Sequence, residues 1–249
     1  MGTEGTKEWA DWNYNIFKGC SNNCRYCYAK FMAKRFDRIK SFDEWRNPVL
    51  SRKVYNNSFK KRKGRGMFPT THDITPYTYA YCITMLQGLL RVGNEILITT
   101  KPNFHLIKML CKAIKPYKKQ VQFRFTITSM DDKKLEYWEE NAPNYKSRKD
   151  SLIHAFGEGF KTSVSIEPYL DATPMYLIND IYLYCTESIW IGIMNPKYNY
   201  GLRSTHIYNE VYVRAMIEDL VEVYSIAYPN TILKKLRLKD SIRNMGISL

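Results

Sequence analysis

The sequence has no long apolar run. Across 249 residues, no segment approaches the roughly 18 consecutive apolar residues that a membrane-spanning helix needs, so we expect no membrane partner. The first ten residues include Glu4 and Glu8 and no apolar stretch, which is not typical of a secretory signal. Low-complexity tracts and repeats at solenoid spacing are also lacking. We therefore expect a cytoplasmic globular protein, for which a hydrophobic content of 45% is ordinary.

Acidic residues are scarce relative to basic ones. The chain has 24 Asp and Glu against 38 Lys and Arg, a net charge of +14, which indicates an anionic partner such as nucleic acid, a nucleotide or a membrane surface. Between residues 51 and 71 there is no acidic residue. That stretch contains seven basic ones: Arg52, Lys53, Lys60, Lys61, Arg62, Lys63 and Arg65. Tyr55, Phe59 and Phe68 lie among them, and charges interleaved with rings can bind single strands or flipped bases. The alternative is a solvated loop, which is our interpretation of the smaller clusters at 112–119 and 146–149.

The cysteines are also not spread along the chain as they would be in a disulfide framework. Three of the six fall within eight residues, which favours metal binding over disulfides. Cys20, Cys24 and Cys27 form a C-x3-C-x2-C loop, and thiolates suit iron–sulfur clusters, zinc and copper(I). The nearest histidine in sequence is His72, so the loop supplies three ligands where a structural zinc site normally has four. Zinc with a distant fourth ligand, Cys82 or His72, stays open. The other cysteines are interpreted as buried apolar residues: Cys82, Cys111 and Cys185.

Strands and helices alternate along the chain. Apolar patterning predicts strands over 12–17, 66–71, 95–100, 121–128, 162–166, 188–194 and 231–238, and helices over 28–39, 77–92, 104–114 and 208–224. Asp131 and Asp132 are expected to open a further helix, and residues 41–66 look irregular. This order favours a parallel sheet covered by helices, in a closed or partial β/α barrel. The chemistry of such barrels lies at the carboxyl ends of the strands, where we expect the cysteine loop.

The cysteine loop resembles that of radical S-adenosylmethionine (SAM) enzymes. It reads Cys20-Ser-Asn-Asn-Cys24-Arg-Tyr26-Cys27, which fits C-x3-C-x-aromatic-C after a first strand. The resemblance implies a [4Fe–4S] cluster on the three cysteines, an open iron that SAM chelates, and Tyr26 near the adenine. It also implies an electron donor, such as a flavodoxin or a ferredoxin-like protein. The implied fold is an α/β partial (β/α)6 barrel in a single domain over 1–249, with a core at about 8–195, a basic insertion at about 41–66 and a C-terminal helical and strand extension at about 196–249.

Further stretches resemble a phage-associated radical SAM family related to spore photoproduct lyase. In chain order they are Glu8-Trp9, Trp12-Asn13, Gly19-Cys20, Thr70-Thr-His-Asp73, Thr99-Thr-Lys101-Pro, Ser165-Ile-Glu167-Pro168, Trp190-Ile-Gly192 and Lys239-Asp-Ser. The resemblance implies that Thr71 and Asp73 lie near the SAM amino group. It also implies that Thr128, Ser129 and Glu167 lie near the ribose or the methionyl part, although Thr and Ser at strand ends can simply form turns or caps. Spore photoproduct lyase has a hydrogen-donating cysteine where this chain has Thr70, so we do not expect repair by that route.

We therefore expect a radical SAM enzyme that cleaves SAM reductively and abstracts hydrogen from a nucleic acid base or nucleotide. A peptide or small-metabolite substrate is the alternative within the same enzyme class. A non-catalytic, zinc-dependent nucleic-acid-binding protein is the alternative from another class. The basic run of residues 52–65 falls between the cluster helix and the second strand, so we expect it to lie beside the mouth of the active site.

Overall fold

A seven-stranded sheet forms the body of the protein, for which a computed structural model describes residues 5–194, 208–228 and 231–249. The strand order is β1-β4-β5-β6-β7-β8-β9, and each neighbouring pair is parallel. The strands are β1 (Trp12–Asn13), β4 (Arg65–Phe68), β5 (Glu95–Thr100), β6 (Val121–Thr126), β7 (Lys161–Ile166), β8 (Ile189–Ile191) and β9 (Leu236–Leu238). The predicted partial β/α barrel is thereby confirmed, with a C-terminal strand as its seventh member.

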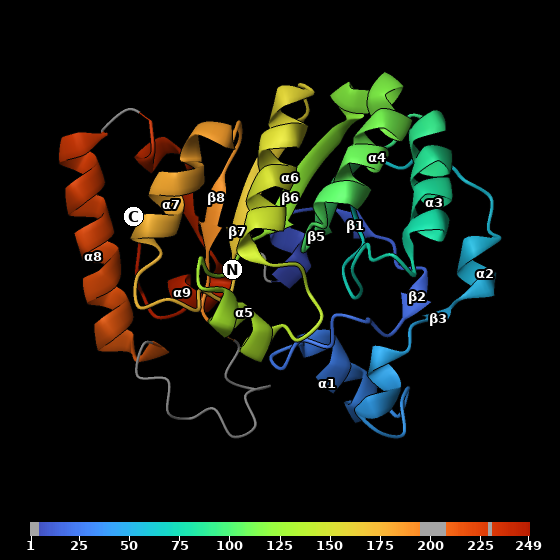
Figure 1. The fold of residues 1–249 in the computed structure, drawn as a ribbon, viewed down its shortest axis with the longest axis horizontal. Helices are drawn as coiled ribbons and strands as arrows, with labels where there is room; N and C mark the ends of the chain where they lie inside the picture. The colour runs from blue at the N-terminus through green and yellow to red at the C-terminus, as the bar shows by residue number, and fades with distance from the viewer. Residues whose placement is uncertain (1–4, 195–207, 229–230) are drawn as a thin grey trace.

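Helices cover the outer face of the sheet (Figure 1). The longer ones are α3 (Tyr79–Arg91), α4 (Phe104–Ile114), α6 (Tyr145–Gly157) and α8 (Glu210–Ala227), and α7 (Met175–Ile181) is shorter. Helix α3 shows why they pack there, because Cys82, Leu86 and Leu89 recur at helical spacing and are buried. Cys111 and Cys185 are fully buried as well, which confirms that the scattered cysteines are core residues.

The first predicted strand, over 12–17, is divided in two. Only Trp12 and Asn13 join the large sheet; β2 (Phe17–Lys18) pairs antiparallel with β3 (Val49–Leu50) in a separate ribbon. Between them the amide N–H of Ile16 donates to Nε2 of His72 at 3.3 Å. The chain therefore leaves the edge of the sheet before it reaches the cysteines.

The insertion at 41–66 is less irregular than predicted. It contains β3 and two short helices, η2 (Asp43–Arg46) and α2 (Arg52–Tyr55). Trp45 is 2% exposed and packs in a small apolar cluster with Cys20 and Ala29. Helix α1 (Tyr28–Arg35) belongs to the same cluster and ends before the predicted Ile39. The first half of the insertion thus supports the cysteine loop.

Several short elements complete the fold. Asp131 caps α5 (Asp132–Trp138) as predicted, by accepting from the amide of Lys133 at 2.9 Å. Helices α6 and α7 had no counterpart in the sequence prediction. The remaining short elements are η1 (Gly5–Glu8), η3 (Lys115–Gln120), η4 (Tyr182–Tyr184), η7 (Leu233–Lys235) and α9 (Asp240–Arg243). Within the described ranges no helix is long and apolar enough to cross a membrane.

The N-terminal segment bridges the two sides of the sheet, from the end of β9 to β4. The buried carboxylate of Glu8 pairs with Lys239, which follows β9, at 2.5 Å and also with Arg243. On the other side, the guanidinium of Arg65 in β4 donates to the carbonyl of Trp9. Trp9 also packs edge-on against Trp190 of β8, with ring centroids 5.7 Å apart. The segment therefore spans the side on which the open barrel would otherwise end.

Candidate active site

The cysteine loop makes a tight passage against the insertion. Gly19 has φ +97°, and a Cβ at this position would lie 2.7 Å from the carbonyl oxygen of Trp45. Only glycine adopts that backbone conformation without strain. The amide of Cys20 then donates to the same carbonyl at 2.8 Å. This contact fixes the first cysteine of the motif.

The other side of the loop is attached to the C-terminal end of α5. The amide of Arg25 donates to the carbonyl of Trp138 at 2.8 Å, and its Nε donates to the carbonyl of Tyr137 at 2.6 Å. The guanidinium lies 4.4 Å over the Tyr137 ring. The side-chain amide of Asn141 donates to the carbonyl of Ser21 at 3.1 Å. Arg25, between the second and third cysteines, thus has a positioning role that its sequence place did not reveal.

All three motif cysteines line one cavity of about 710 Å³. The same cavity is lined by polar residues in the last positions of the strands or in the turns after them: Thr70, Thr71, Asp73, Lys101, Thr126, Ser165 and Glu167. Lys239, Asp240 and Ser241 enter from the C-terminal region. Residues that follow parallel strands meet at one end of a barrel, and α1 lies at this lower end of the sheet in Figure 1. The structure therefore places the cysteine loop at the face that the sequence predicted.

The chemistry of the cavity suits a cationic cluster. Burial raises the pKa of the Cys24 thiol to about 12, and burial together with the Asp73 carboxylate raises the pKa of Cys20. A bound metal cation offsets such a shift, because coordination deprotonates a thiol outright. In the described part of the chain no three His, Cys, Asp or Glu side chains gather closely enough for one metal ion. A four-iron cluster takes each thiolate on a different iron, so its ligands need not converge on one point.

Asp73 connects the loop to the strand ends. Its Oδ2 accepts from the side-chain amide of Asn22 at 3.0 Å. Its Oδ1 accepts from the hydroxyl of Thr100 at 2.8 Å and from the amide of Lys101 at 2.7 Å. These three bonds use most of the roughly four acceptor sites of a carboxylate. Asp73 is therefore first of all a residue that holds the loop against β5.

Asn15, which the sequence did not single out, holds the turn that contains Thr70 and Thr71. Its Oδ1 accepts from the amides of both threonines, at 2.7 and 2.9 Å. Its Nδ2 donates to the Thr70 hydroxyl at 2.6 Å. Three bonds from one side chain fix the backbone where β4 meets the cavity. The hydroxyl of Tyr28 donates to the Thr70 carbonyl at 2.8 Å, which attaches α1 to the same turn.

A buried charged network supports the cavity wall behind Tyr26. The Tyr26 hydroxyl donates to Glu139, and Glu139 pairs with Arg148 at 2.5 Å, both side chains being 0% exposed. Burial lowers the pKa of Lys101, but the thiolate of Cys24 and other negative charges outweigh burial and raise it well above its usual value. The interpretation of residues 146–149 as solvated surface is wrong for Arg148. Its burial follows from a long-range partner, which sequence neighbours do not indicate.

The structure places Thr128 and Ser129 outside the lining of the cavity. Both are buried. The Thr128 hydroxyl donates to Glu139 at 2.9 Å, and the Ser129 hydroxyl donates to Asp171 at 2.8 Å. Thr126 lines the cavity in their place. Both residues thus have partners behind the wall, while Thr71, Asp73, Tyr26 and Glu167 do line it.

None of the seven residues of the basic run lines this cavity, contrary to expectation. Arg65 begins β4 in register with Glu95, the first residue of β5, so residues 60–65 lie at the amino ends of the strands. The rings are not free for base stacking either. Phe68 is fully buried, Phe59 packs against Gly88, and Tyr55 packs edge-on against another ring.

Glu167 gives the cavity a pH-dependent group, which leads to a prediction. Burial raises its pKa to about 7, against the opposing charge of Lys239. The folded state then holds a proton that the unfolded chain, with a pKa near 4.5, releases, so stability is lost as pH rises from about 4.5 to 7. Glu167→Gln should remove this loss. Melting curves at pH 5 and pH 8 should show the variant gaining about 1–3 kcal/mol relative to wild type at the higher pH.

Glu187→Gln is the matched control, because Glu187 is exposed. It should melt in parallel with wild type across the same pH range. A pH-independent difference between Glu167→Gln and wild type would contradict the assigned protonation of Glu167.

Comparison with known proteins places this geometry in a fold family. No family model matches the chain. A curated viral relative, the uncharacterized protein ORF301 of Acidianus two-tailed virus, is 28% identical over 174 residues, which are 65% of this chain and 57% of the relative. The chain thus spans little more than half of that relative's length.

Among solved structures, a spore photoproduct lyase variant matches with a TM-score of 0.60 and 12% identity, over 95% of this chain and 78% of the lyase. SuiB of Streptococcus suis bound to S-adenosylmethionine matches with a TM-score of 0.57 and 11% identity, over 91% of this chain and 49% of SuiB. The chain has the fold of spore photoproduct lyase and SuiB. A lyase variant with bound AdoMet and dinucleoside spore photoproduct matches at a TM-score of 0.55.

Proposed function

We propose that this protein is a radical SAM enzyme with its [4Fe–4S] cluster on Cys20, Cys24 and Cys27. The observation that carries the proposal is the shared cavity. Three cysteines from one loop and polar residues at the strand ends line the same cavity, which has a volume of about 710 Å³. The fold is shared with SAM-binding proteins. When bound, a reduced cluster supplies the electron that cleaves SAM to methionine and a 5′-deoxyadenosyl radical, which abstracts a hydrogen atom from the substrate.

The side chains around the cavity suit the parts of SAM. Lys101 lines the wall next to Tyr26, with its ammonium 5.6 Å from the ring centroid, and would pair with the methionyl carboxylate. Tyr26 would lie along the adenine, and Asp73 and Thr71 near the amino group. These residues are half-buried in the cavity wall, which limits the access of water to the reacting atoms. The electron donor would be a flavodoxin or a ferredoxin-like protein.

The proposed substrate is a nucleic acid base or nucleotide. One solved lyase of the same fold carries a dinucleoside photoproduct together with AdoMet, and the net charge of +14 favours an anionic partner. Thr70 is held by Asn15 and carries no thiol, so the donor that returns hydrogen in spore photoproduct lyase has no equivalent at this position. A base modification suits the site better than repair by that route. A viral relative favours a role in viral nucleic acid metabolism.

The proposal predicts SAM cleavage by the reduced protein. Anaerobically reconstituted protein incubated with SAM and dithionite should release 5′-deoxyadenosine, slowly alone and faster with the correct nucleic acid, because substrate binding completes the closed site. Liquid chromatography with mass spectrometry measures the product and any altered base. Heat-treated protein is the control for chemical breakdown.

Three outcomes would contradict the proposal in different parts. A reducible cluster that yields no 5′-deoxyadenosine would contradict the enzymatic function. Cleavage that peptides or metabolites stimulate, and nucleic acids do not, would move the substrate to those classes. Bound zinc in place of iron and sulfide would favour the non-catalytic alternative.

A further inference from the structure

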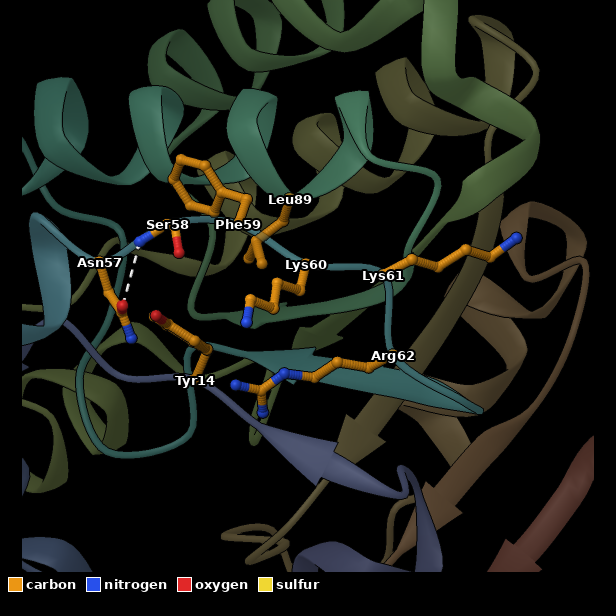
Figure 2. A pocket seen from close by; sticks show the side chains of 8 residues that line it. All are labelled: Tyr14, Asn57, Ser58, Phe59, Lys60, Lys61, Arg62 and Leu89. Carbon is orange, nitrogen blue, oxygen red and sulfur yellow. Dashed lines mark hydrogen bonds between the residues drawn. The ribbon is translucent and has the colours of Figure 1, made fainter.

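A second cavity, of about 360 Å³, is separate from that of the cysteine loop, and Figure 2 shows the residues that line it. Its lining comes from the segment 57–62, from Tyr14 just after β1, and from Leu89 near the end of α3. Three of these residues are basic: Lys60, Lys61 and Arg62. It shares no lining residue with the cavity of the cysteines.

The backbone of this segment is held in place. The buried side chain of Asn94 accepts from the amide of Arg62 at 2.8 Å and donates to the carbonyl of Lys60 at 3.1 Å. Just before Lys60, the ring of Phe59 packs against Gly88 of α3 and fills the space that a side chain at position 88 would need. The segment is therefore a built wall of the cavity, unlike the solvated loop that a charge run usually forms.

The two outer basic side chains point into the cavity. In Figure 2 Lys60 and Arg62 extend toward Tyr14, whereas Lys61 extends the other way. The distances agree, because the Arg62 guanidinium lies 5.6 Å from the centroid of the Tyr14 ring and 5.0 Å from that of Trp12. The Lys61 side chain passes within 4 Å of the Cβ position of Gly93. The charged groups of Lys60 and Arg62 therefore share one cavity, whereas Lys61, which lies between them in the sequence, points away from it.

Neither cation is neutralised within the described part of the chain. No ion pair among the described residues includes Lys60 or Arg62. Asp11, an acidic residue beside this segment, accepts from the amide of Arg65 at 2.8 Å. The cations of Lys60 and Arg62 share the cavity with the hydroxyl of Ser58 and the side-chain amide of Asn57. This combination forms a site for a phosphate, since guanidinium and ammonium groups are the usual hydrogen-bond donors to phosphate.

We propose that this cavity binds a backbone phosphate of a single-stranded nucleic acid whose target base reaches the cysteine cavity. The proposal rests on the proposed function for the identity of the substrate. The site contacts phosphates and not bases, because Phe59 is packed against α3 and the Tyr14 ring has Arg62 beside it. Binding here is therefore independent of sequence and dependent on salt.

The position of the cavity sets a minimum length for the strand. Residues 60–65 lie at the amino ends of the strands and the cysteines at the carboxyl ends, and a strand of six residues such as β5 spans about 20 Å. A stacked strand rises about 3.4 Å per nucleotide. At this rise about six nucleotides cover about 20 Å, so stacked oligonucleotides shorter than roughly six nucleotides do not reach both sites, and a dinucleotide engages the cysteine cavity alone.

The test compares matched charge removals in the reconstituted holoenzyme. Binding of a fluorescent single-stranded 16-nucleotide DNA is measured by anisotropy between 50 and 200 mM salt. Lys60→Gln with Arg62→Gln should flatten the log–log salt slope by about 0.7 for each phosphate that is no longer bound, so by roughly 0.7 to 1.4. Lys61→Gln, a neighbouring charge removal, should leave the slope unchanged, and Arg62→Lys should preserve it. Equal effects of Lys60→Gln and Lys61→Gln, or no effect of either, would overturn the site.

Two further measurements separate this proposal from the proposed function. SAM cleavage without nucleic acid should be the same in wild type and in every variant, and stimulation by a dinucleotide should not distinguish them. If the double variant loses the salt-dependent DNA binding of wild type, and wild type does not cleave SAM, the phosphate site is supported and the enzymatic function is contradicted. If wild type cleaves SAM but does not bind DNA, the enzymatic function is supported and the phosphate site is contradicted. Inorganic phosphate that competes as well as the 16-nucleotide DNA would assign the cavity to a free anion and overturn the nucleic acid proposal.

Discussion

Substituting Cys20, Cys24 or Cys27 by Ala is expected to remove iron from the protein and to abolish SAM cleavage. Each cysteine would hold a different iron of the cluster, and with three protein ligands the loss of one leaves two. Anaerobic iron and sulfide analysis should fall from about four irons per chain to near none. The single variants should still fold, since the loop is held by Gly19 and by the contacts of Arg25.

The matched controls are the cysteines of the core. Cys82, Cys111 and Cys185 are 0% exposed and pack among apolar side chains. Their substitution by Ala should lower stability by about 1 kcal/mol through poorer packing and leave the iron content intact. Iron missing from Cys82→Ala alone would show that the cluster, or a zinc ion, has a fourth protein ligand.

The sequence predicted the parts of the site that follow directly from local order. Three thiolates at short spacing are a ligand set in any fold, and a loop that follows a strand of a parallel barrel lies at its carboxyl end. The places of Thr71, Asp73 and Glu167 were implied by the resemblance to radical SAM enzymes and not by local order. Asp73, in the turn after β4, and Glu167, directly after β7, both line the cavity.

Direction along the strands also explains what the sequence argument misjudged. Residues 60–64 precede β4 and Arg65 begins it, so the parallel sheet places them at its amino end, far from residues that follow the strand. Closeness in sequence to the cluster helix suggested the opposite. Asn15 was missed because a single asparagine within an aromatic stretch carries no periodic signal. Only the paired amides of Thr70 and Thr71 reveal its role.

Arg148→Met is expected to lower the free energy of unfolding by about 3–5 kcal/mol. The guanidinium pairs with Glu139 at 2.5 Å, and neither side chain is exposed. Its Nε also donates to the carbonyl of Pro143 at 2.7 Å. Burial raises the pKa of Glu139, but the charges of Arg148 and Lys101 together with the hydrogen bonds to Glu139 outweigh burial and lower it. Removing the arginine leaves a buried carboxylate without its cation, which costs far more than losing an exposed pair.

Urea denaturation of the purified protein measures this effect. Lys146→Met is the matched control, because Lys146 pairs with Asp150 on the same helix while its side chain is 80% exposed. It should change stability by less than about 1 kcal/mol. Combining Arg148→Met with Glu139→Gln should recover much of the stability, since no unpaired charge remains. The double variant should nevertheless bind SAM more weakly than wild type, because it lacks the Glu139 carboxylate that accepts from Tyr26 in the cavity wall. A destabilisation by Arg148→Met no larger than that by Lys146→Met would show that water or another group satisfies Glu139 and that the network does not stabilise the fold.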